Sequence, residues 1–186
     1  MFSYYCNCLR SRNKILAVCN QLQLWVSHTF EGMKFEAYSE IDIYPDFTTF
    51  DFISDGCNGK IPKRVQILPT PIPNVYNLSF GDIKENGELD DLIISNNGDR
   101  NKILATILKV VVGYTYKFPD RLIYFKGSTE QRTRLYRIAV SLNLEELSEI
   151  FEIYADIMGD LDLVRFQKGL NIKAFVIKRK VIKFVI

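Results

Sequence analysis

Apolar and polar residues alternate along the first half of the chain, as they do in β-strands. The alternation is clearest over residues 35–44, and it predicts a strand with one buried face. Shorter apolar and aromatic runs predict further strands at 47–53, 64–68, 75–80 and 89–95. Residues that favour turns separate these runs, notably at 55–59, 69–73 and 85–88. The first half of the chain is therefore predicted to form a β-meander.

The period of the pattern changes near residue 99. Apolar residues three and four positions apart predict a helix over 99–116, which Pro119 stops, and a second helix over 128–142. The core stripe expected on the second helix is Leu135, Ile138, Ala139 and Leu142. A buried strand is expected at 122–125, a short helical turn at 143–147, and strands at 151–155, 161–166 and 172–177. The predicted fold is α+β, with a mixed, mostly antiparallel sheet and two main helices, in the order β-meander and then α-β-α-β-β-β.

Residues 1–32 differ in character from the rest. They lack a clear period, and a strand-like stretch begins only after Gly32. One interpretation places them outside the domain, upstream of a start at Met33. The other is a short helix over 13–27 that packs its apolar residues on the domain. We therefore expect an N-terminal extension, 1–32, and a single α+β domain, 33–186.

Composition narrows the class of protein without naming an activity. Of the 186 residues, 47% are hydrophobic and 25% are charged, as in a globular domain. The net charge of +2 is too small to indicate nucleic-acid binding by itself. No apolar run approaches the roughly 20 residues that span a bilayer, and the N-terminus lacks the order of a secretory signal. We expect a cytoplasmic protein with no membrane association.

Cysteine and histidine are too sparse for a metal site. The chain has four cysteines, at positions 6, 8, 19 and 57, and one histidine, His28. The spacing of Cys6 and Cys8 is not that of a zinc knuckle. Reduced thiols and no bound metal are expected. With His28 as the only imidazole, no Ser-His-Asp or Cys-His catalytic set can be assembled.

The beginnings of the two main helices are the candidate ligand-binding sites. A helix N-terminus carries about half a positive charge, which usually attracts Asp and Glu. Here both helices carry cations in their opening turns, with Glu130 partly offsetting them at the second, beside a glycine that allows close approach, and this pattern favours an anion such as phosphate. The predicted ligand-binding residues are Asn97, Gly98, Arg100 and Lys102 at the first helix and Gly127, Ser128, Thr129 and Arg132 at the second. Ordinary helix caps, Asp99 or Asn97 for the first and Ser128 with Gln131 for the second, are the alternative.

Tyr136 is the one candidate for a catalytic role. It follows Arg132 by four residues and shares its helix face, so the pair could grip an anion while the phenol donates a proton. The alternative is an arginine stacked on an aromatic ring at the domain surface.

Two charged stretches carry weaker hypotheses. Lys178, Arg179, Lys180 and Lys183 could touch nucleic acid or an acidic partner, or could form a solvated edge strand. The acidic residues between Asp82 and Asp91 could collect a divalent ion, or could simply flank a hairpin turn in solvent.

Three separated blocks of the sequence resemble an uncharacterised bacterial family, a domain of unknown function. The blocks are 76–82 (YNLSFGD), 95–106 (SNNGDRNKILAT) and 127–137 (GSTEQRTRLYR). The resemblance covers about residues 35–178. It implies a shared domain and brings no established activity.

The predicted order of elements is also similar to the acetyl-CoA-dependent N-acetyltransferase fold. In that family a glycine-rich loop and the helix after it hold the cofactor pyrophosphate, and the matching segment here is 96–102. A tyrosine in the following helix acts as general acid toward the departing thiolate, and Tyr136 occupies a similar place. The chain departs from the family pattern because only Gly98 remains of the loop glycines and Asp99 lies where a pyrophosphate would be repelled.

Three functions follow from these observations. The first is a binding or regulatory module that recognises an anionic small molecule or a protein partner, in a bacterial defence or toxin-type system. The second is an acyl-CoA-dependent N-acetyltransferase-like enzyme that uses acetyl-CoA, or a degenerate non-catalytic relative of one. The third is a domain that serves oligomerisation. Nucleic acid stays open as a partner.

Overall fold

The fold is that of a computed structural model, which describes residues 36–157 and 162–180. The chain divides into two units, Met1–Met33 and Lys34–Ile186, and the described residues all belong to the second. The helix expected over 13–27, the cysteines at 6, 8 and 19, His28 and Lys183 lie outside the described residues. The predicted boundary at residue 33 stays a prediction.

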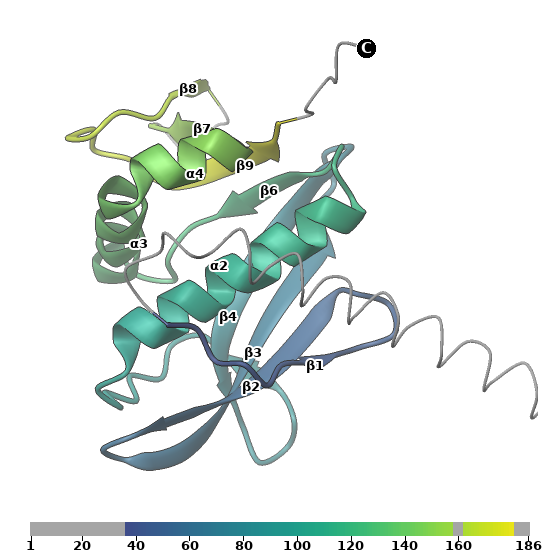
Figure 1. The fold of residues 1–186 in the computed structure, drawn as a ribbon, viewed down its shortest axis with the longest axis vertical. Coiled ribbons are helices and arrows are strands. Elements are labelled where there is room, and N and C mark those ends of the chain that lie inside the picture. The colour runs from purple at the N-terminus through teal and green to yellow at the C-terminus, as the bar shows by residue number, and fades with distance from the viewer. Residues whose placement is uncertain (1–35, 158–161, 181–186) are drawn as a thin grey trace, which may run out of the picture. The chain divides into compact units, whose positions relative to one another are not determined.

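Nine strands form one mixed sheet in the described part of the chain (Figure 1). The first five are β1 (Asp42–Ile43), β2 (Thr49–Gly56), β3 (Gly59–Pro69), β4 (Val75–Ile83) and β5 (Leu89–Asp90). The later strands are β6 (Leu122–Phe125), β7 (Phe151–Asp156), β8 (Leu163–Arg165) and β9 (Ala174–Arg179). Their spatial order is β1-β2-β3-β4-β6-β9-β7-β8, with β5 paired to β4. Among the described strands, only β4 and β6 pair in parallel. The predicted α+β class with a mostly antiparallel sheet is confirmed.

Three helices are described: α2 (Arg100–Lys117), α3 (Glu130–Leu142) and α4 (Leu144–Ile150). The helix α2 connects the parallel strands β4 and β6, a connection that requires a crossover of a dozen or more residues. In Figure 1, α2 crosses in front of β4 and α4 lies in front of β9. The predicted bounds of α2 are correct to one residue, and those of β6 are the same as predicted, because both segments have a strong local pattern.

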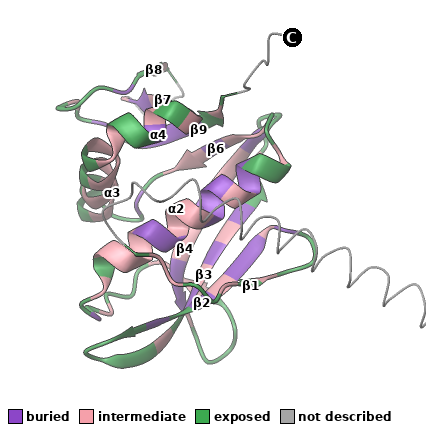
Figure 2. Ribbon diagram, viewed as in Figure 1, coloured by how far each residue is buried: buried purple, intermediate pink, exposed green. Residues whose placement is uncertain are grey.

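The core lies where these helices cover the sheet (Figure 2). Alternation along the strands directs one face inward, so Phe50 and Phe52 of β2 and Val65 and Ile67 of β3 are buried. The helix α2 contributes Val111 and Tyr114, among others. The strands at the other end contribute the fully buried residues Ile123, Phe151, Phe175 and Val176.

Two predicted strands are mostly irregular. Of residues 36–44 only Asp42–Ile43 pairs in the sheet, and the backbone amide of Tyr38 donates instead to the Thr106 hydroxyl on α2 at 2.9 Å. Of 89–95 only Leu89–Asp90 pairs, because side chains and not a neighbouring strand bind the later carbonyls. The prediction was wrong at both places because alternation cannot identify hydrogen-bond partners distant in sequence.

Two further predictions were wrong, one about burial and one about the position of a strand in the sheet. The stripe expected in the core from α3 is not buried: none of its residues is, and Ile138 and Leu142 are exposed. For the basic segment that begins at Lys178, one of the two alternatives was a solvated strand at the sheet edge. Lys178 and Arg179 instead belong to β9, which lies between β6 and β7. The backbone of β9 is therefore hydrogen-bonded to a strand on each side.

Candidate functional site

The helices α2 and α3 begin on the same side of the domain, on the left in Figure 1. The irregular segment 91–95 is hydrogen-bonded to residues near both helix starts. The Ser128 hydroxyl donates to the Asp91 carbonyl at 2.6 Å, and the Arg132 Nη2 donates to the Ile93 carbonyl at 2.5 Å. Further along, the Asn58 side-chain amide donates to the Ser95 carbonyl at 2.8 Å. The segment thus runs from the start of α3 to the β2–β3 turn, and α2 begins five residues later.

The residue before α2 does not cap the helix. Asp99 has the N-cap position, but its side chain accepts no hydrogen bond from the helix amides. Its Oδ2 instead accepts from the Tyr38 hydroxyl at 2.6 Å and from the Ser54 hydroxyl at 2.7 Å. Its Oδ1 is buried and has no hydrogen-bond partner among the described residues. The first turn of α2 contains no acidic residue and keeps its amides uncapped by a side chain.

The Asn97 side chain is occupied within the fold. Its Nδ2 donates to the Ser54 hydroxyl at 2.8 Å and to the Gly59 carbonyl at 3.0 Å, while its Oδ1 accepts from the Asn58 amide at 2.8 Å. These bonds attach the β2–β3 turn to the loop before α2. The next residue, Gly98, has φ of +81°, a conformation that glycine adopts without strain. Asn97 therefore positions the loop, and Gly98 allows the chain to turn into the helix.

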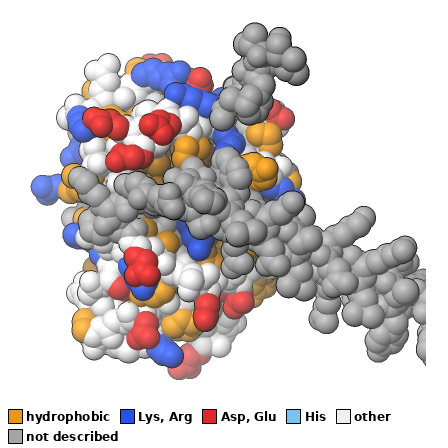
Figure 3. Space-filling view, in the orientation of Figure 1, with side chains coloured by type: hydrophobic (Ala, Val, Ile, Leu, Met, Phe, Trp, Pro, Cys, Tyr) orange, Lys and Arg blue, Asp and Glu red, His pale blue; other side chains and the backbone are white. Residues whose placement is uncertain are grey.

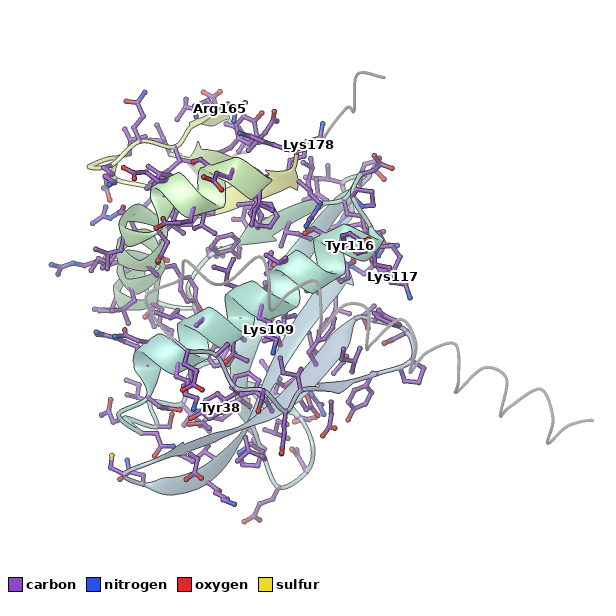
Figure 4. All side chains as sticks on the ribbon, in the orientation of Figure 1. Tyr38, Lys109, Tyr116, Lys117, Arg165 and Lys178 are labelled. Atoms are coloured by element: carbon purple, nitrogen blue, oxygen red, sulfur yellow. The ribbon has the colours of Figure 1, made fainter. Side chains whose placement is uncertain are left out.

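The two cations of the first turn of α2 differ in their surroundings. Arg100 is exposed to solvent. The Lys102 Nζ lies 4.5 Å from the centre of the Tyr38 ring and 3.9 Å from a carboxylate oxygen of Glu36. Figure 4 shows Tyr38 beside the beginning of α2. Lys102 is thus held by neighbours, whereas Arg100 extends into solvent.

At α3 the cap is Thr129, not Ser128. The Thr129 hydroxyl accepts from the Arg132 amide at 3.3 Å, so the alternative cap of Ser128 with Gln131 is wrong. The Ser128 hydroxyl instead accepts a hydrogen bond from the Arg132 Nη1 at 3.0 Å and donates one to the segment 91–95. A side chain at Gly127 would collide with the backbone nitrogen of Thr133. The glycine is therefore needed because α3 begins close to the end of β6.

Tyr136 lies half-buried on the face of α3 toward the sheet. Its ring contacts Phe125 of β6 edge-on at 6.1 Å between centroids. Burial raises the pKa of the Tyr136 phenol; the Arg132 charge acts in the opposite direction, and Asp91 raises the pKa further. The phenol is therefore protonated at neutral pH. The Arg132 guanidinium is bound to Ser128 and Ile93, so it is not simply stacked on Tyr136.

Sequence reasoning missed a buried cluster beneath this region. The Lys63 Nζ donates to the Asp82 carboxylate and, at 2.6 Å, to the Ser95 hydroxyl. Lys63 alternates in phase with the buried residues Val65 and Ile67, so its position in the strand pattern could have identified it. Asp82, for which a divalent-ion site or a solvated position beside a hairpin turn were the alternatives, is buried in this cluster. Ser54 and Tyr38 were missed as well; Ser54 is in phase with Phe50 and Phe52.

The described residues contain no group of three or more His, Cys, Asp or Glu that could hold a metal ion. Cys57 has an exposed free thiol. None of the described helices is long and apolar enough to cross a membrane.

The model of one family matches residues 34–180, and its description is "Family of unknown function (DUF6934)". No curated protein and no solved structure matches the chain.

Proposed function

The chain belongs to the DUF6934 family, and we propose that its domain is a binding module for an anionic ligand or partner. The recognition surface would consist of residues 91–102 and 127–132, which we term the entrance surface. The setting proposed for this module is the cytoplasm of a bacterium, in a defence or toxin-type system, and that part rests on the sequence alone.

One observation carries the proposal: the Asp99 carboxylate is directed away from the amides of α2. Tyr38 and Ser54 bind it, so the first turn of α2 lacks a side-chain cap and holds two cations instead of acids. Placing cations at the positive end of a helix is unfavourable by a few tenths of a kcal/mol to about 1 kcal/mol. An anion bound there would offset that cost and would accept hydrogen bonds from the free amides.

The exposed apolar residues in the entrance surface favour a ligand that has an apolar group as well as a negative charge. Leu92 is 66% exposed and Ile94 is 76% exposed, in the segment between the two helix starts. A ligand with a phosphate or carboxylate at one end and an apolar group at the other would match both features. An acidic peptide with apolar residues would match them equally well.

Ligand-dependent melting of the full chain tests the proposal. Inorganic pyrophosphate and coenzyme A are suitable probes, and a probe at about 100 times its dissociation constant stabilises by about 2.7 kcal/mol. We expect Arg100→Ala to reduce the stabilisation. The control is Lys168→Ala, which removes an exposed cation between β8 and β9. This variant should be stabilised by the probe as much as the wild type is. A response to neither probe, or an equal loss in both variants, would count against the entrance surface.

The second candidate function is an acyl-CoA-dependent transferase, and the β4–β6 pair favours it. These parallel strands pair over only three residue pairs, Val75–Asn77 with Leu122–Tyr124, after which β4 continues beside β5. The segment 96–102, which leads from this region into α2, matches the loop and helix start that hold the cofactor pyrophosphate in the N-acetyltransferase family. Tyr136 would be the general acid, and its raised pKa keeps the proton that this role needs.

An acetyl-transfer assay of the wild type and of Tyr136→Phe separates the two functions. For a transferase, the variant should still be stabilised by acetyl-CoA but should lose most of its acetyl transfer to an amine acceptor. For a binding module, or for a degenerate relative, the wild-type chain transfers no acetyl group.

A further inference from the structure

A serine, a lysine and an aspartate form a chain of hydrogen bonds from the entrance surface into the core. The Lys63 Nζ lies 2.6 Å from the Ser95 hydroxyl oxygen and also contacts the Asp82 carboxylate. Lys63 is 1% exposed and Asp82 is 7% exposed, whereas Ser95 is half-buried. A hydroxyl within hydrogen-bond reach of a base, with the base oriented by a third group, is the arrangement of a catalytic nucleophile.

The backbone around Ser95 is held by a side chain of the β2–β3 turn. The Asn58 Nδ2 donates to the Ser95 carbonyl at 2.8 Å and to the Asn96 carbonyl at 3.2 Å. Asn96 has φ of +44°, in the left-handed region that is uncommon for residues other than glycine. Backbone in such regions occurs often at active sites, where it keeps a reacting group in position. These contacts keep Ser95 beside the Lys63 amine.

The segment that leads to Ser95 is apolar and exposed. Leu92, Ile93 and Ile94 are 66%, 42% and 76% exposed. Figure 3 shows that elsewhere on the face drawn the apolar side chains are scattered in small groups among polar and charged ones. Three consecutive exposed apolar residues are unusual on a protein surface unless they bind a partner or ligand. An apolar acyl group would contact them directly beside the Ser95 hydroxyl.

We infer that Ser95 is the nucleophile of a site that cleaves carboxylic esters of apolar acids, with Lys63 as its general base. The Ser95 oxygen would attack the carbonyl carbon of the ester, and the hydroxyl proton would pass to the Lys63 amine. The bond to the alcohol oxygen then breaks, and the departing alkoxide takes the proton from Lys63. Water attacks the acyl-serine ester by the same route, which releases the carboxylic acid and restores the Ser95 hydroxyl.

Asp82 supplies the form of Lys63 that this step needs. Burial disfavours charged side chains, so an amine beside a carboxylic acid is the neutral alternative to the ion pair, with the same number of protons. In that form one N–H of Lys63 donates to Asp82, and the nitrogen lone pair accepts from the Ser95 hydroxyl. Asp82 therefore orients the amine and holds the proton that Lys63 would otherwise carry.

Covalent labelling of the full chain with an alkyl fluorophosphonate tests the nucleophile, because this uncharged probe reacts with activated serines and needs no anion-binding group. We expect mass spectrometry to locate the adduct on Ser95, and we expect the chain to hydrolyse para-nitrophenyl butyrate. Ser95→Ala should lose both reactions, and it leaves the Lys63–Asp82 pair in place. The matched control is Ser141→Ala, which changes another half-buried serine, in α3, and should react as the wild type does.

The general base is tested in a variant that keeps Ser95. Lys63→Met combined with Asp82→Leu removes both charges, and it should be labelled at least about a hundredfold more slowly, the contribution typical of a general base. Circular dichroism establishes that this variant is folded, so the slower labelling reports the missing base and not unfolding. The located adduct and Ser95→Ala decide the nucleophile independently of this variant.

Esterase activity goes beyond the proposed anion binding, and the two fail separately. Labelling of Ser95 in a chain that does not respond to pyrophosphate would support the ester site and remove only the anion-binding function. An unlabelled wild type, an adduct on another residue, unchanged labelling of Ser95→Ala or of the folded double variant, or an equal loss in Ser141→Ala would each overturn the inference.

Discussion

Lys63 and Asp82 lie directly opposite each other on β3 and β4 and form an ion pair that is almost fully buried. The Lys63 Nζ also donates to the Ser95 hydroxyl at 2.6 Å. The pair therefore links the core of the sheet to the segment 91–95, which leads to both helix starts. Through Ser95 the entrance surface is thus hydrogen-bonded to a buried charged group.

The first prediction is that Lys63→Met strongly destabilises the domain. The Asp82 carboxylate would be left buried without its cation, and breaking a buried pair in this way costs about 3–5 kcal/mol. Urea unfolding measures the change. The control is Lys63→Met combined with Asp82→Leu, which removes both charges and should be closer to the wild type. A single variant as stable as the wild type would show that the pair is dispensable.

The second prediction concerns Gly56 at the end of β2. A Cβ at this position would collide with the backbone carbonyl oxygen of Asn97, which accepts from the Cys57 amide at 3.1 Å. We expect Gly56→Ala to destabilise by about 1–3 kcal/mol, since the backbone must shift to relieve the contact. The matched control is Gly113→Ala in α2, where a Cβ meets nothing within 4 Å. Alanine should stabilise the helix there by about 0.5–1 kcal/mol.

The third prediction concerns alkaline pH and Tyr114. Burial raises the pKa of this phenol above its ordinary value of 10.0, while the nearby Arg121 guanidinium, whose Nη1 donates to the hydroxyl at 2.6 Å, acts to lower it. The pKa of Tyr114 is therefore higher in the folded protein than in the unfolded protein, so the protonated phenol stabilises the folded state. This stabilisation is complete below pH 10 and is lost as the pH rises through the pKa of the folded protein.

Comparison with Tyr114→Phe isolates this effect from other groups that titrate at alkaline pH. Removing the hydroxyl should lower stability by about 1 kcal/mol at pH 7, through the lost hydrogen bond. The difference between the two proteins should shrink as the pH rises from 9 to 11. Urea unfolding at each pH measures it, and a constant difference would contradict the prediction.

The fourth prediction concerns Lys109, which lies midway along α2 (Figure 4). Burial lowers the pKa of its ammonium group, so the charged form is disfavoured in the folded state. Lys109→Met should therefore stabilise the domain at pH 7 by a few tenths of a kcal/mol to about 1 kcal/mol.

The gain from Lys109→Met should decrease as the pH approaches 10.5, because the lysine then loses its charge in the folded state. The control is Lys126→Met, which replaces an exposed lysine and should leave stability almost unchanged. Thermal and urea unfolding at pH 7 and pH 10 compare the two variants.

Part of the candidate site could be recognised from local sequence. The glycines at 98 and 127 and the cations at the two helix starts are adjacent to strongly periodic helices, so their positions were predictable. The partners of these residues were not. Asp99 was a plausible helix cap by spacing, yet it binds Tyr38 and Ser54, which precede it by 61 and 45 residues.

The sequence by itself determined the α+β class, the order of the elements and the bounds of α2 and β6, because these depend on the spacing of apolar residues within one segment. Only the tertiary structure decided that Lys63 pairs with Asp82, that β9 lies inside the sheet, and that Ile138 and Leu142 face solvent. Periodicity shows that a segment has an apolar face. The surface that covers that face, or leaves it exposed, comes from residues far away in the chain, whose contacts form only when the whole domain packs.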